Sequence, residues 1–297
     1  MNLVATLAGG NRPVPYNSGE HIAMESDDQV LPGQGLKPEK MPGHWLLAQM
    51  GKRVLRPGGL ELTQRMIDAL AICGSDHVVE FAPGLGATAR LTLRHDPASY
   101  TAVERDEEAA AIVRGFLQGD TQKIVIGHAE ETGLAEDSAS VVYGEAMLSM
   151  QPPGTKSRII CEACRLLRPG GRYAIHELCL VPDDLAESVK NEIQQSLSAA
   201  IHVGVRPLTV AEWRELLEAG GLAVKEHAQA PMHLLEPKRL VQDEGLFGAV
   251  RFVWNVARHK EARRRVFAMR GVFRKYRDHL AAIMLVGQKA EEQRRER

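Results

Sequence analysis

The 297-residue sequence contains no long hydrophobic run. No stretch reaches the roughly 18 consecutive apolar residues that a membrane-spanning helix needs. The first residues, MNLVATLAGGNRPVPY, have neither the basic segment nor the apolar core of a signal peptide. The sequence therefore predicts no membrane span, and we expect a cytoplasmic protein.

The net charge is close to zero, and cysteines are few. The 37 lysines and arginines nearly balance 38 aspartates and glutamates, so overall charge does not favour nucleic acid or an anionic membrane as a partner. Cys161 and Cys164 form a CxxC pair, but there is no second pair and no neighbouring histidine pair to complete a zinc site. We expect no metal, and interpret the four cysteines as small buried residues.

The arrangement of apolar residues divides the chain into four parts. Residues 1–43 are rich in glycine, proline and polar residues, which predicts an irregular N-terminal arm. Residues 44–74 have helical periodicity and predict a pair of helices ahead of the sheet. Residues 75–235 and 279–290 alternate strand-like with helical segments, which is typical of a parallel sheet covered on both faces. Residues 236–278 are helical and too long for a loop, so they predict a cap.

The most informative stretch is HVVEFAPGLGATARLTLRH, residues 77–95. An apolar strand ends in the turn Ala82-Pro83-Gly84-Leu85-Gly86, and a helix follows at once. Glycines in such a turn let a ligand lie against bare backbone at the N-terminus of the helix. Glu104 ends the next strand, where an acidic side chain accepts hydrogen bonds from both ribose hydroxyls. Together the two features predict a ligand of the adenosine type without a 2′-phosphate.

In these motifs the chain resembles class I S-adenosylmethionine-dependent methyltransferases, in particular the small-molecule enzymes of the ubiquinone-biosynthesis type. Glu80 to Gly86 matches the acidic, glycine-rich first motif, with Ala82 in place of the first glycine, and Glu104 matches the ribose-binding acid. His128-Ala129 stands where the family commonly has Asp-Ala. Residues 167–171 match its LRPGG turn, and residues 207–220 resemble its sixth helix. The resemblance covers roughly residues 60–235 and the last strand.

The resemblance implies a doubly wound, Rossmann-like α/β fold with a seven-stranded sheet, mostly parallel, whose last strand is antiparallel. It implies S-adenosylmethionine as the cofactor. A nicotinamide-dependent dehydrogenase would share the glycine turn and the acid, but the LRPGG turn and the last strand favour the methyltransferase. The expected cofactor-binding residues come from the glycine turn and the ends of the next strands: Glu80, Ala82, Pro83, Gly84, Gly86, Glu104, Arg105, His128, Ala129, Glu130 and Glu145.

Catalytic residues are expected at the carboxyl edge of the sheet. Methyl transfer requires a positioned nucleophile, and also a base if the nucleophile begins protonated. Glu145 follows the fourth strand, and His176 and Glu177 lie near the end of the fifth, so these three are the predicted catalytic candidates. A histidine can accept a proton near neutral pH. Two alternatives stay open: Glu145 binds the cofactor or caps a helix, and His176 points into a helix interface.

Two peripheral elements bear on the substrate. The resembled family often has an N-terminal lid over the site, and residues 44–74 are the expected lid helices. Trp45 in this lid could cover an aromatic or acyl ligand, or serve only as an apolar anchor. Residues 237–278 contain 12 lysines and arginines against four acidic residues, which could attract an anionic substrate, a membrane surface or RNA. We interpret this segment as a solvated basic surface, because its apolar residues predict buried helix faces: Phe252, Val253, Trp254, Val256, Val266, Phe267, Val272 and Phe273.

The sequence therefore predicts a methyltransferase that acts on a small, partly apolar acceptor at O, N, C or S. The alternatives are methyl transfer to RNA or protein through the basic cap, and a regulatory module that binds the nucleotide without turnover. Residues 144–147 read Gly-Glu-Ala-Met, where enzymes that methylate base amino groups have Asn-Pro-Pro-Tyr. Nucleic acid is thus not the expected partner. The oligomeric state is left open, with a homodimer as one alternative.

Overall fold

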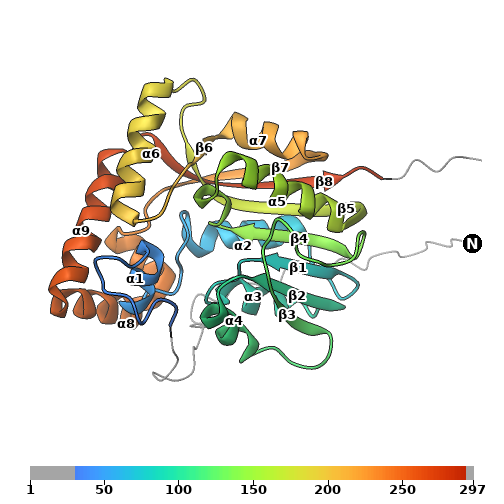
Figure 1. Cartoon of the computed structure of the whole chain (residues 1–297), viewed down its shortest axis with the longest axis horizontal. Coiled ribbons are helices and arrows are strands. Elements are labelled where there is room, and N and C mark those ends of the chain that lie inside the picture. The colour runs from blue at the N-terminus through green and yellow to red at the C-terminus, as the bar shows by residue number, and fades with distance from the viewer. Residues whose placement is uncertain (1–30, 292–297) are drawn as a thin grey trace, which may run out of the picture.

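A computed structural model describes residues 31–291 of the chain (Figure 1). The predicted irregular arm falls largely on residues 1–30, which lie outside the described residues, and residues 31–42 form turns. Within the described residues, no helix is both long enough and apolar enough to cross a bilayer.

One mixed sheet forms the centre of the structure (Figure 1). Seven strands follow the spatial order β3-β2-β1-β4-β5-β8-β7, and the two-residue strand β6 pairs with β5. Strands β1 to β5 run parallel, whereas β8 lies antiparallel between β5 and β7. The predicted fold class is thereby confirmed. The strands are β1 (His77–Phe81), β2 (Ser99–Glu104), β3 (Gln122–Ile126), β4 (Ala139–Glu145), β5 (Leu167–Leu180), β6 (Leu208–Thr209), β7 (Leu222–Pro231) and β8 (Leu280–Lys289).

Helices cover both faces of this sheet, which explains why its strands are apolar on both sides. On one face Val78, Val141 and Ala174 pack against α2 (Gly59–Leu70), α3 (Ala87–Leu93) and α4 (Glu107–Arg114). On the other face Val79 and Val142 pack against α5 (Pro153–Leu166) and α7 (Val210–Ala219). Neighbouring residues of one strand thus point to opposite layers, as the strand period of two requires.

The two predicted lid helices differ in position. α2 buries its apolar stripe against the sheet, so it belongs to the central layer. α1 (Gly43–Gln49) instead packs with the helices at one end of the molecule, shown at the left of Figure 1. These are α6 (Glu187–Ile201), α8 (Pro237–Arg258) and α9 (Lys260–Lys275). A short 3₁₀ helix, η1 (Leu148–Met150), follows β4.

The apolar residues of α8 and α9 are only in part buried. Phe252, Val256 and Phe273 lie in the core shared with α1 and α6. Trp254 and Phe267, however, are 61% and 59% exposed, and Val253 is exposed as well. The prediction of buried helix faces is wrong for these three residues, because the spacing of apolar residues does not show how many faces of a helix find a partner.

The cysteine prediction is also wrong in part. Cys179 is buried, but Cys161 is exposed, and Cys73 and Cys164 are partly exposed. Cys161 lies on the outward side of α5, whose inward side is formed by Ile159, Ile160 and Ala163.

Candidate active site

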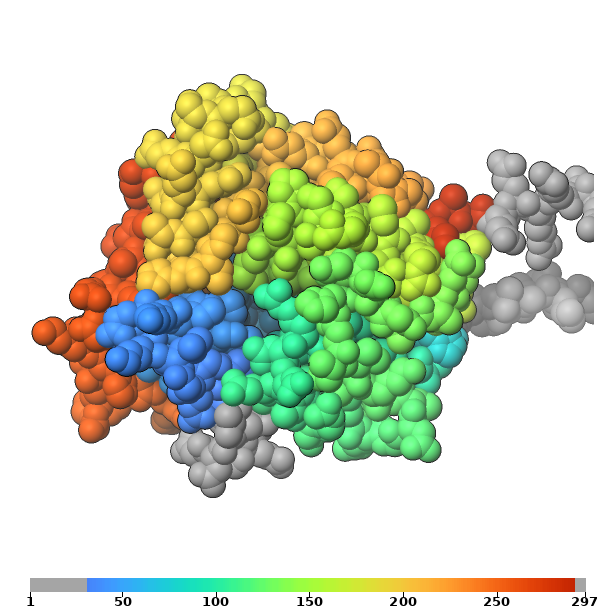
Figure 2. All heavy atoms as spheres, in the orientation of Figure 1, coloured from blue at the N-terminus to red at the C-terminus, as the bar shows by residue number. Residues whose placement is uncertain are grey.

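A cavity of about 570 Å³ lies at the carboxyl ends of the parallel strands. Figure 2 shows a hollow in the surface where three parts of the chain meet. These are the N-terminal segment with α1 (blue), α6 (yellow) and the segment that forms the first strands (green). Its wall includes Trp45, Glu104, His128, Met147, Ile201 and Phe273. The volume is that of a typical small-ligand site, and parallel α/β sheets bind ligands at this edge.

The glycine turn after β1 forms one wall of the cavity. Gly86 has φ of 73° and opens α3, and a Cβ built there would lie 2.5 Å from the ring of Phe116. Glycine is therefore required at this position by both backbone and space. Ala82 adopts φ of 51°, a left-handed conformation that costs an alanine about 1–2 kcal/mol. Ala82 thus keeps the backbone conformation of the glycine that it replaces in the family motif.

Glu104 joins the end of β2 to the glycine turn. Its Oε2 accepts a hydrogen bond of 3.2 Å from the amide of Gly84, and its Oε1 accepts the amides of Arg105 (2.9 Å) and Asp106 (3.1 Å). Burial raises the pKa of this carboxyl, although the three amide bonds oppose the rise. Oε2 retains lone-pair capacity, and Glu104 lines the cavity, so this oxygen is the one available to a ribose hydroxyl.

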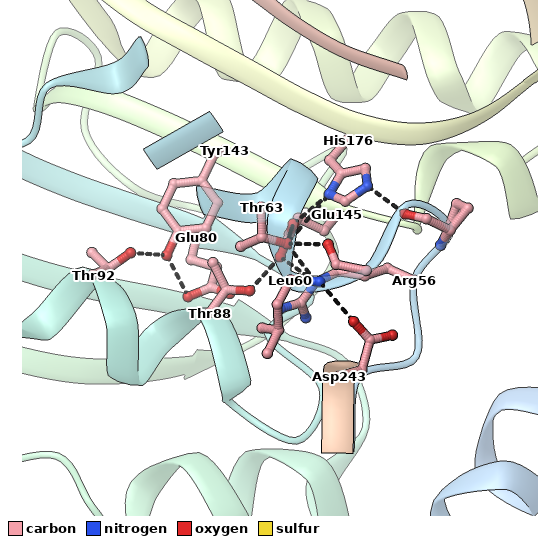
Figure 3. A network of polar contacts seen from close by, with 12 residues as sticks. Arg56, Leu60, Thr63, Glu80, Thr88, Thr92, Tyr143, Glu145, His176 and Asp243 are labelled. Atoms are coloured by element: carbon pink, nitrogen blue, oxygen red, sulfur yellow. Dashed lines mark hydrogen bonds and ion pairs between the residues drawn. The ribbon is translucent and has the colours of Figure 1, made fainter. Parts of the chain in front are cut away.

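Glu80 lies beneath the glycine turn in a buried group of hydroxyls (Figure 3). Its Oε2 accepts hydrogen bonds from the hydroxyls of Tyr100 and Tyr143. Tyr143 is in turn 2.6 Å from the hydroxyl of Thr92. Burial raises the pKa of Glu80 to about 7, because the two phenol hydroxyls only partly offset the loss of water.

Glu145, at the end of β4, collects hydrogen bonds from several elements (Figure 3). Its Oε1 accepts the hydroxyl of Thr63 on α2 (2.6 Å), and its Oε2 accepts the hydroxyl of Thr88 on α3. The guanidinium Nε of Arg56 lies 3.4 Å from Oε2. Burial alone would raise the pKa of Glu145, but the charge of Arg56 and the contact with His176 lower it to about 2. The carboxylate is ionised and ties α2 and α3 to the sheet.

His176 is fully buried, and both ring nitrogens face oxygen atoms. Nε2 lies 2.6 Å from the carbonyl oxygen of Pro57, and Nδ1 lies 2.7 Å from Oε1 of Glu145. Because a carbonyl only accepts, Nε2 is the donor to Pro57, and Nδ1 is occupied by its contact with the Glu145 carboxylate. In this arrangement His176 has no free ring nitrogen for a substrate.

Comparison with known proteins identifies the family. Residues 79–175 match the family described as a methyltransferase domain. An uncharacterized protein of Haemophilus influenzae is 32% identical over 231 residues, which cover 76% of this chain and 90% of the relative. The chain belongs to the class I S-adenosylmethionine-dependent methyltransferases.

Two further relatives are more distant. A malonyl-[acyl-carrier protein] O-methyltransferase of Methylococcus capsulatus is 27% identical over 146 residues, 46% of this methyltransferase and only 51% of that relative. The crystal structure of phosphoethanolamine N-methyltransferase 2 of Haemonchus contortus with S-adenosylmethionine has a TM-score of 0.64 and 13% identity, covering 84% of this chain and 57% of that one. At such identity the second comparison shows a shared fold.

Most of the residues predicted to bind the cofactor line the cavity of the methyltransferase. Gly84 and Gly86 are the exceptions, and they shape the turn through their backbone. The bare backbone of the turn, the carboxylate of Glu104 and the volume of the cavity together fit the family's cofactor. The residues that line the cavity are Glu80, Ala82, Pro83, Glu104, Arg105, His128, Ala129, Glu130 and Glu145.

The structure places the three predicted catalytic residues differently. Glu145 lines the cavity, whereas His176 lies behind it. Glu177 lines the cavity wall but accepts four hydrogen bonds, from the amides of Met147 (2.9 Å), Leu148 (2.7 Å) and Ser149 (3.0 Å) and from the hydroxyl of Ser149 (2.7 Å). It thus holds the loop after β4 in place. A role in proton transfer stays a prediction for all three.

Arg56 is a site residue that sequence reasoning missed. Its Nε donates to the Thr63 hydroxyl (2.6 Å), while its buried Nη2, in the cavity wall, has no hydrogen-bond partner among the described residues. The loop that carries it is fixed by α8, because the carboxylate of Glu244 accepts the amides of Arg53 (3.0 Å) and Val54 (2.9 Å). The only sequence signal was an arginine before a Pro-Gly-Gly turn, which predicts the end of a helix.

The start of α1 also contributes more than its sequence indicated. Trp45 lies across the glycine turn, 4.0 Å from where a Cβ of Gly84 would stand. Its neighbour His44 lines the cavity, and burial together with the charge of Arg105 lowers the pKa of His44 to about 4. His44 is therefore neutral at pH 7, and its Nδ1 has no partner within residues 31–291. The start of α1 thus lies against the glycine turn.

Proposed function

We propose that this methyltransferase binds S-adenosylmethionine in the cavity and methylates a small, partly apolar acceptor at an O, N, C or S atom. The observation that carries the proposal is the division of the cavity wall. Its polar side consists of the glycine turn and the ends of β1, β2 and β4, and its other side is apolar. The polar side suits the cofactor, and the apolar side suits the acceptor.

The cofactor would be held by residues of the polar side. Glu104 would accept a hydrogen bond from a ribose hydroxyl, and the turn from Ala82 to Gly86 would lie against the cofactor with bare backbone. Arg56 offers its unpartnered Nη2 to an anionic group, for which the carboxylate of the methionine moiety is the natural ligand. When bound, S-adenosylmethionine supplies a methyl group on a positively charged sulfur.

The acceptor side is walled by α6, α9 and the segments that follow α6 and β7. These elements contribute aliphatic, thioether and aromatic side chains, which exclude water and favour an apolar ligand. Methionines suit such a wall because their flexible side chains adapt to a ligand's shape. The residues are Ile201, Val203, Val205, Met232, Leu234, Met269 and Phe273.

We assign positioning roles to Glu145, His176 and Glu177. Glu145 and His176 join the Pro57 loop to β4 and β5 and so hold Arg56 at the cavity wall. Glu177 holds the loop of Met147 to Ser149, which also lines the cavity. Because their polar atoms are occupied, these residues would orient the two ligands of the methyltransferase rather than exchange protons with them.

Calorimetry on a variant of Glu104 tests the cofactor assignment. Glu104→Ala removes a charge-assisted acceptor for the ribose and also the carboxylate that holds the Gly84 amide, so the affinity for S-adenosylmethionine should fall by about 100-fold. Glu107→Ala, an exposed glutamate on the adjacent α4, is the matched control and should bind as the wild type does. Unchanged affinity of Glu104→Ala would reject the pocket assignment.

Labelling tests the acceptor class. With S-adenosylmethionine labelled in its methyl group and a cell extract, label should pass into molecules that an organic solvent extracts. Label in RNA or protein would instead support methyl transfer to a macromolecule through the basic cap. Binding of the cofactor with no transfer to any fraction would support a regulatory module.

A further inference from the structure

The outer face of α8 is a row of exposed apolar side chains, which we define as Leu246, Phe247, Val250, Val253 and Trp254. Phe247 is 83% exposed, and the other four are more than half exposed. Their spacing of three, four and seven residues places them on one side of the helix. An exposed apolar row of this kind, which includes two aromatic rings, marks an interaction surface.

The fold keeps this row on the outside. The opposite side of α8 is already buried, because Ala249, Phe252 and Val256 pack in the core shared with α1 and α9. Just before the row, Gly245 leaves the helical conformation, with φ of 70° and ψ of 171°. Glu244, on the other side of this kink, is bound to the Arg53 loop. The helix is anchored at both places and cannot rotate its outer face inward.

Positive charge predominates in the α8–α9 hairpin. Residues 245–275 contain nine arginines and lysines and one acidic residue, Glu261; Arg265 is buried, and Arg270 and Arg274 pair with Glu236. Arg258 lies over the ring of Trp254, with 5.5 Å from its guanidinium carbon to the ring centroid. At the turn from α8 to α9, a hollow is lined by Lys260, Glu261, Arg263, Arg264 and the exposed Phe267, and Glu261 pairs with Arg264 at 2.9 Å. The chemistry that complements this region is therefore apolar in the middle and anionic at its rim.

We propose that the outer face of α8 binds the surface of a lipid bilayer that contains anionic lipids. The row from Leu246 to Trp254 would enter the boundary between headgroups and acyl chains, with Trp254 at the interface that tryptophan prefers. The basic residues of the α8–α9 turn would contact anionic headgroups, each adding to the attraction. A bilayer supplies both parts of the complement at once, which favours it over a second copy of this basic hairpin.

Binding of α8 to a bilayer also has a consequence for the methyl acceptor. This consequence rests on the proposed function. Met269 and Phe273 of α9 line the apolar side of the cavity, and α9 is joined directly to α8. One hairpin therefore connects the membrane surface with the acceptor side. The acceptor class that fits is a lipophilic molecule dissolved in the bilayer.

Co-sedimentation of the full chain with vesicles tests the proposal. Vesicles of phosphatidylcholine mixed with phosphatidylglycerol should bind the protein at low salt, and vesicles of phosphatidylcholine alone should bind it more weakly. Raising the salt to about 0.5 M should weaken binding, because exposed charges are then screened. The double substitution Phe247→Ser/Trp254→Ser should reduce the partition coefficient by about 100-fold, since two large side chains lose their burial.

Matched control variants distinguish binding through the outer face of α8 from non-specific adsorption to vesicles. Ile126→Ser removes another exposed apolar side chain, on β3, and Lys123→Glu reverses an exposed charge on the same strand. Both should leave vesicle binding unchanged, whereas Arg263→Glu/Arg264→Glu should weaken it. S-adenosylmethionine affinity without lipid should be the same in all variants, so failure of the cofactor assignment is distinguishable from failure of docking.

Three results would overturn the proposal. The first is no binding of the wild type to the mixed vesicles, and the second is equal binding by Phe247→Ser/Trp254→Ser. The third is a concentration-dependent dimer that the double substitution abolishes in the absence of vesicle binding, which would assign the outer face to a second copy of the chain.

Discussion

Replacing Glu80 by glutamine should change how the stability of this methyltransferase depends on pH. Burial raises the pKa of Glu80 from its usual 4.5 to about 7, so the folded protein holds this proton more tightly than the unfolded chain does. The stabilisation is fully present below pH 4.5 and is lost as the pH rises through 7. A difference of about 2.5 pKa units corresponds to about 3 kcal/mol of unfolding free energy.

Glutamine keeps an oxygen that can accept the hydroxyls of Tyr100 and Tyr143, but it does not titrate. The unfolding free energy of Glu80→Gln minus that of the wild type should therefore rise by about 3 kcal/mol as the pH increases from about 5 to about 8. The assay is urea unfolding, followed by circular dichroism at several pH values without cofactor. Glu215→Gln, at an exposed position on α7, should show a constant difference from the wild type.

The comparison must be made between variant and wild type, because His44 acts in the opposite sense. Its lowered pKa, about 4, contributes stability that is present above pH 6.5 and is lost as the pH falls through 4. The titrations of Glu80 and His44 both shape the pH dependence of wild-type stability. Subtracting the wild-type profile from that of Glu80→Gln isolates the contribution of Glu80. If the difference between Glu80→Gln and the wild type stays constant from about pH 5 to about pH 8, the buried carboxyl is not protonated as we infer.

Three substitutions near the same site have different expected outcomes. Ala82→Gly should raise the unfolding free energy by about 0.5–1 kcal/mol, because relief of the left-handed alanine exceeds the entropy gained by the unfolded chain; a loss of stability in urea unfolding would contradict strain at this residue. Gly86→Ala should lower the unfolding free energy by about 2 kcal/mol or more, because the new Cβ meets Phe116. Adding Phe116→Ala should recover only the part of this loss that comes from the clash, since the left-handed backbone at residue 86 remains. His176→Ala should cost about 3 kcal/mol, because Glu145 then loses a buried partner. It should lower kcat without changing the shape of the pH–rate profile, and loss of the fall in rate at low pH would instead identify His176 as the base.

The conformation of the glycine turn was readable from sequence because it depends on backbone. The turn from Ala82 to Gly86 needs left-handed conformations, and Glu104 stands at a fixed position after a strand. Both requirements restrict which residue types can occupy these positions, so they are visible in the sequence. The periodicity of apolar residues likewise identified the helices and strands that bury two layers of side chains.

The roles of His176 and Glu177 could not be read in this way. The sequence predicted that both residues lie near the end of the fifth strand, but β5 continues to Leu180 because β8 and β6 pair with its last residues. His176 therefore lies within the sheet rather than at its edge. Its partners, Pro57 and Glu145, come from distant segments, and strand periodicity contains no information about them.

Arg56 and His44 were missed for a related reason. Each lies in a short connecting segment, and each gains its position from contacts that are distant in sequence, such as Glu244 with the Arg53 loop. The outer face of α8 shows the converse limit. Sequence locates its apolar residues but does not count the neighbours available to cover them, so Trp254 was expected to be buried and is exposed.

The position of β8 constrains the order in which the chain can fold. β8 lies between β5 and β7, so one edge of β5 is open and β7 has no paired strand until residues 280–289 have been synthesised and inserted. The α8–α9 hairpin is made before β8, and it exposes apolar residues of its own. A nascent chain thus presents open strand edges together with the outer face of α8, a combination prone to misassociation. Docking of the hairpin on a bilayer during synthesis would shield one of these two surfaces while the other waits for β8.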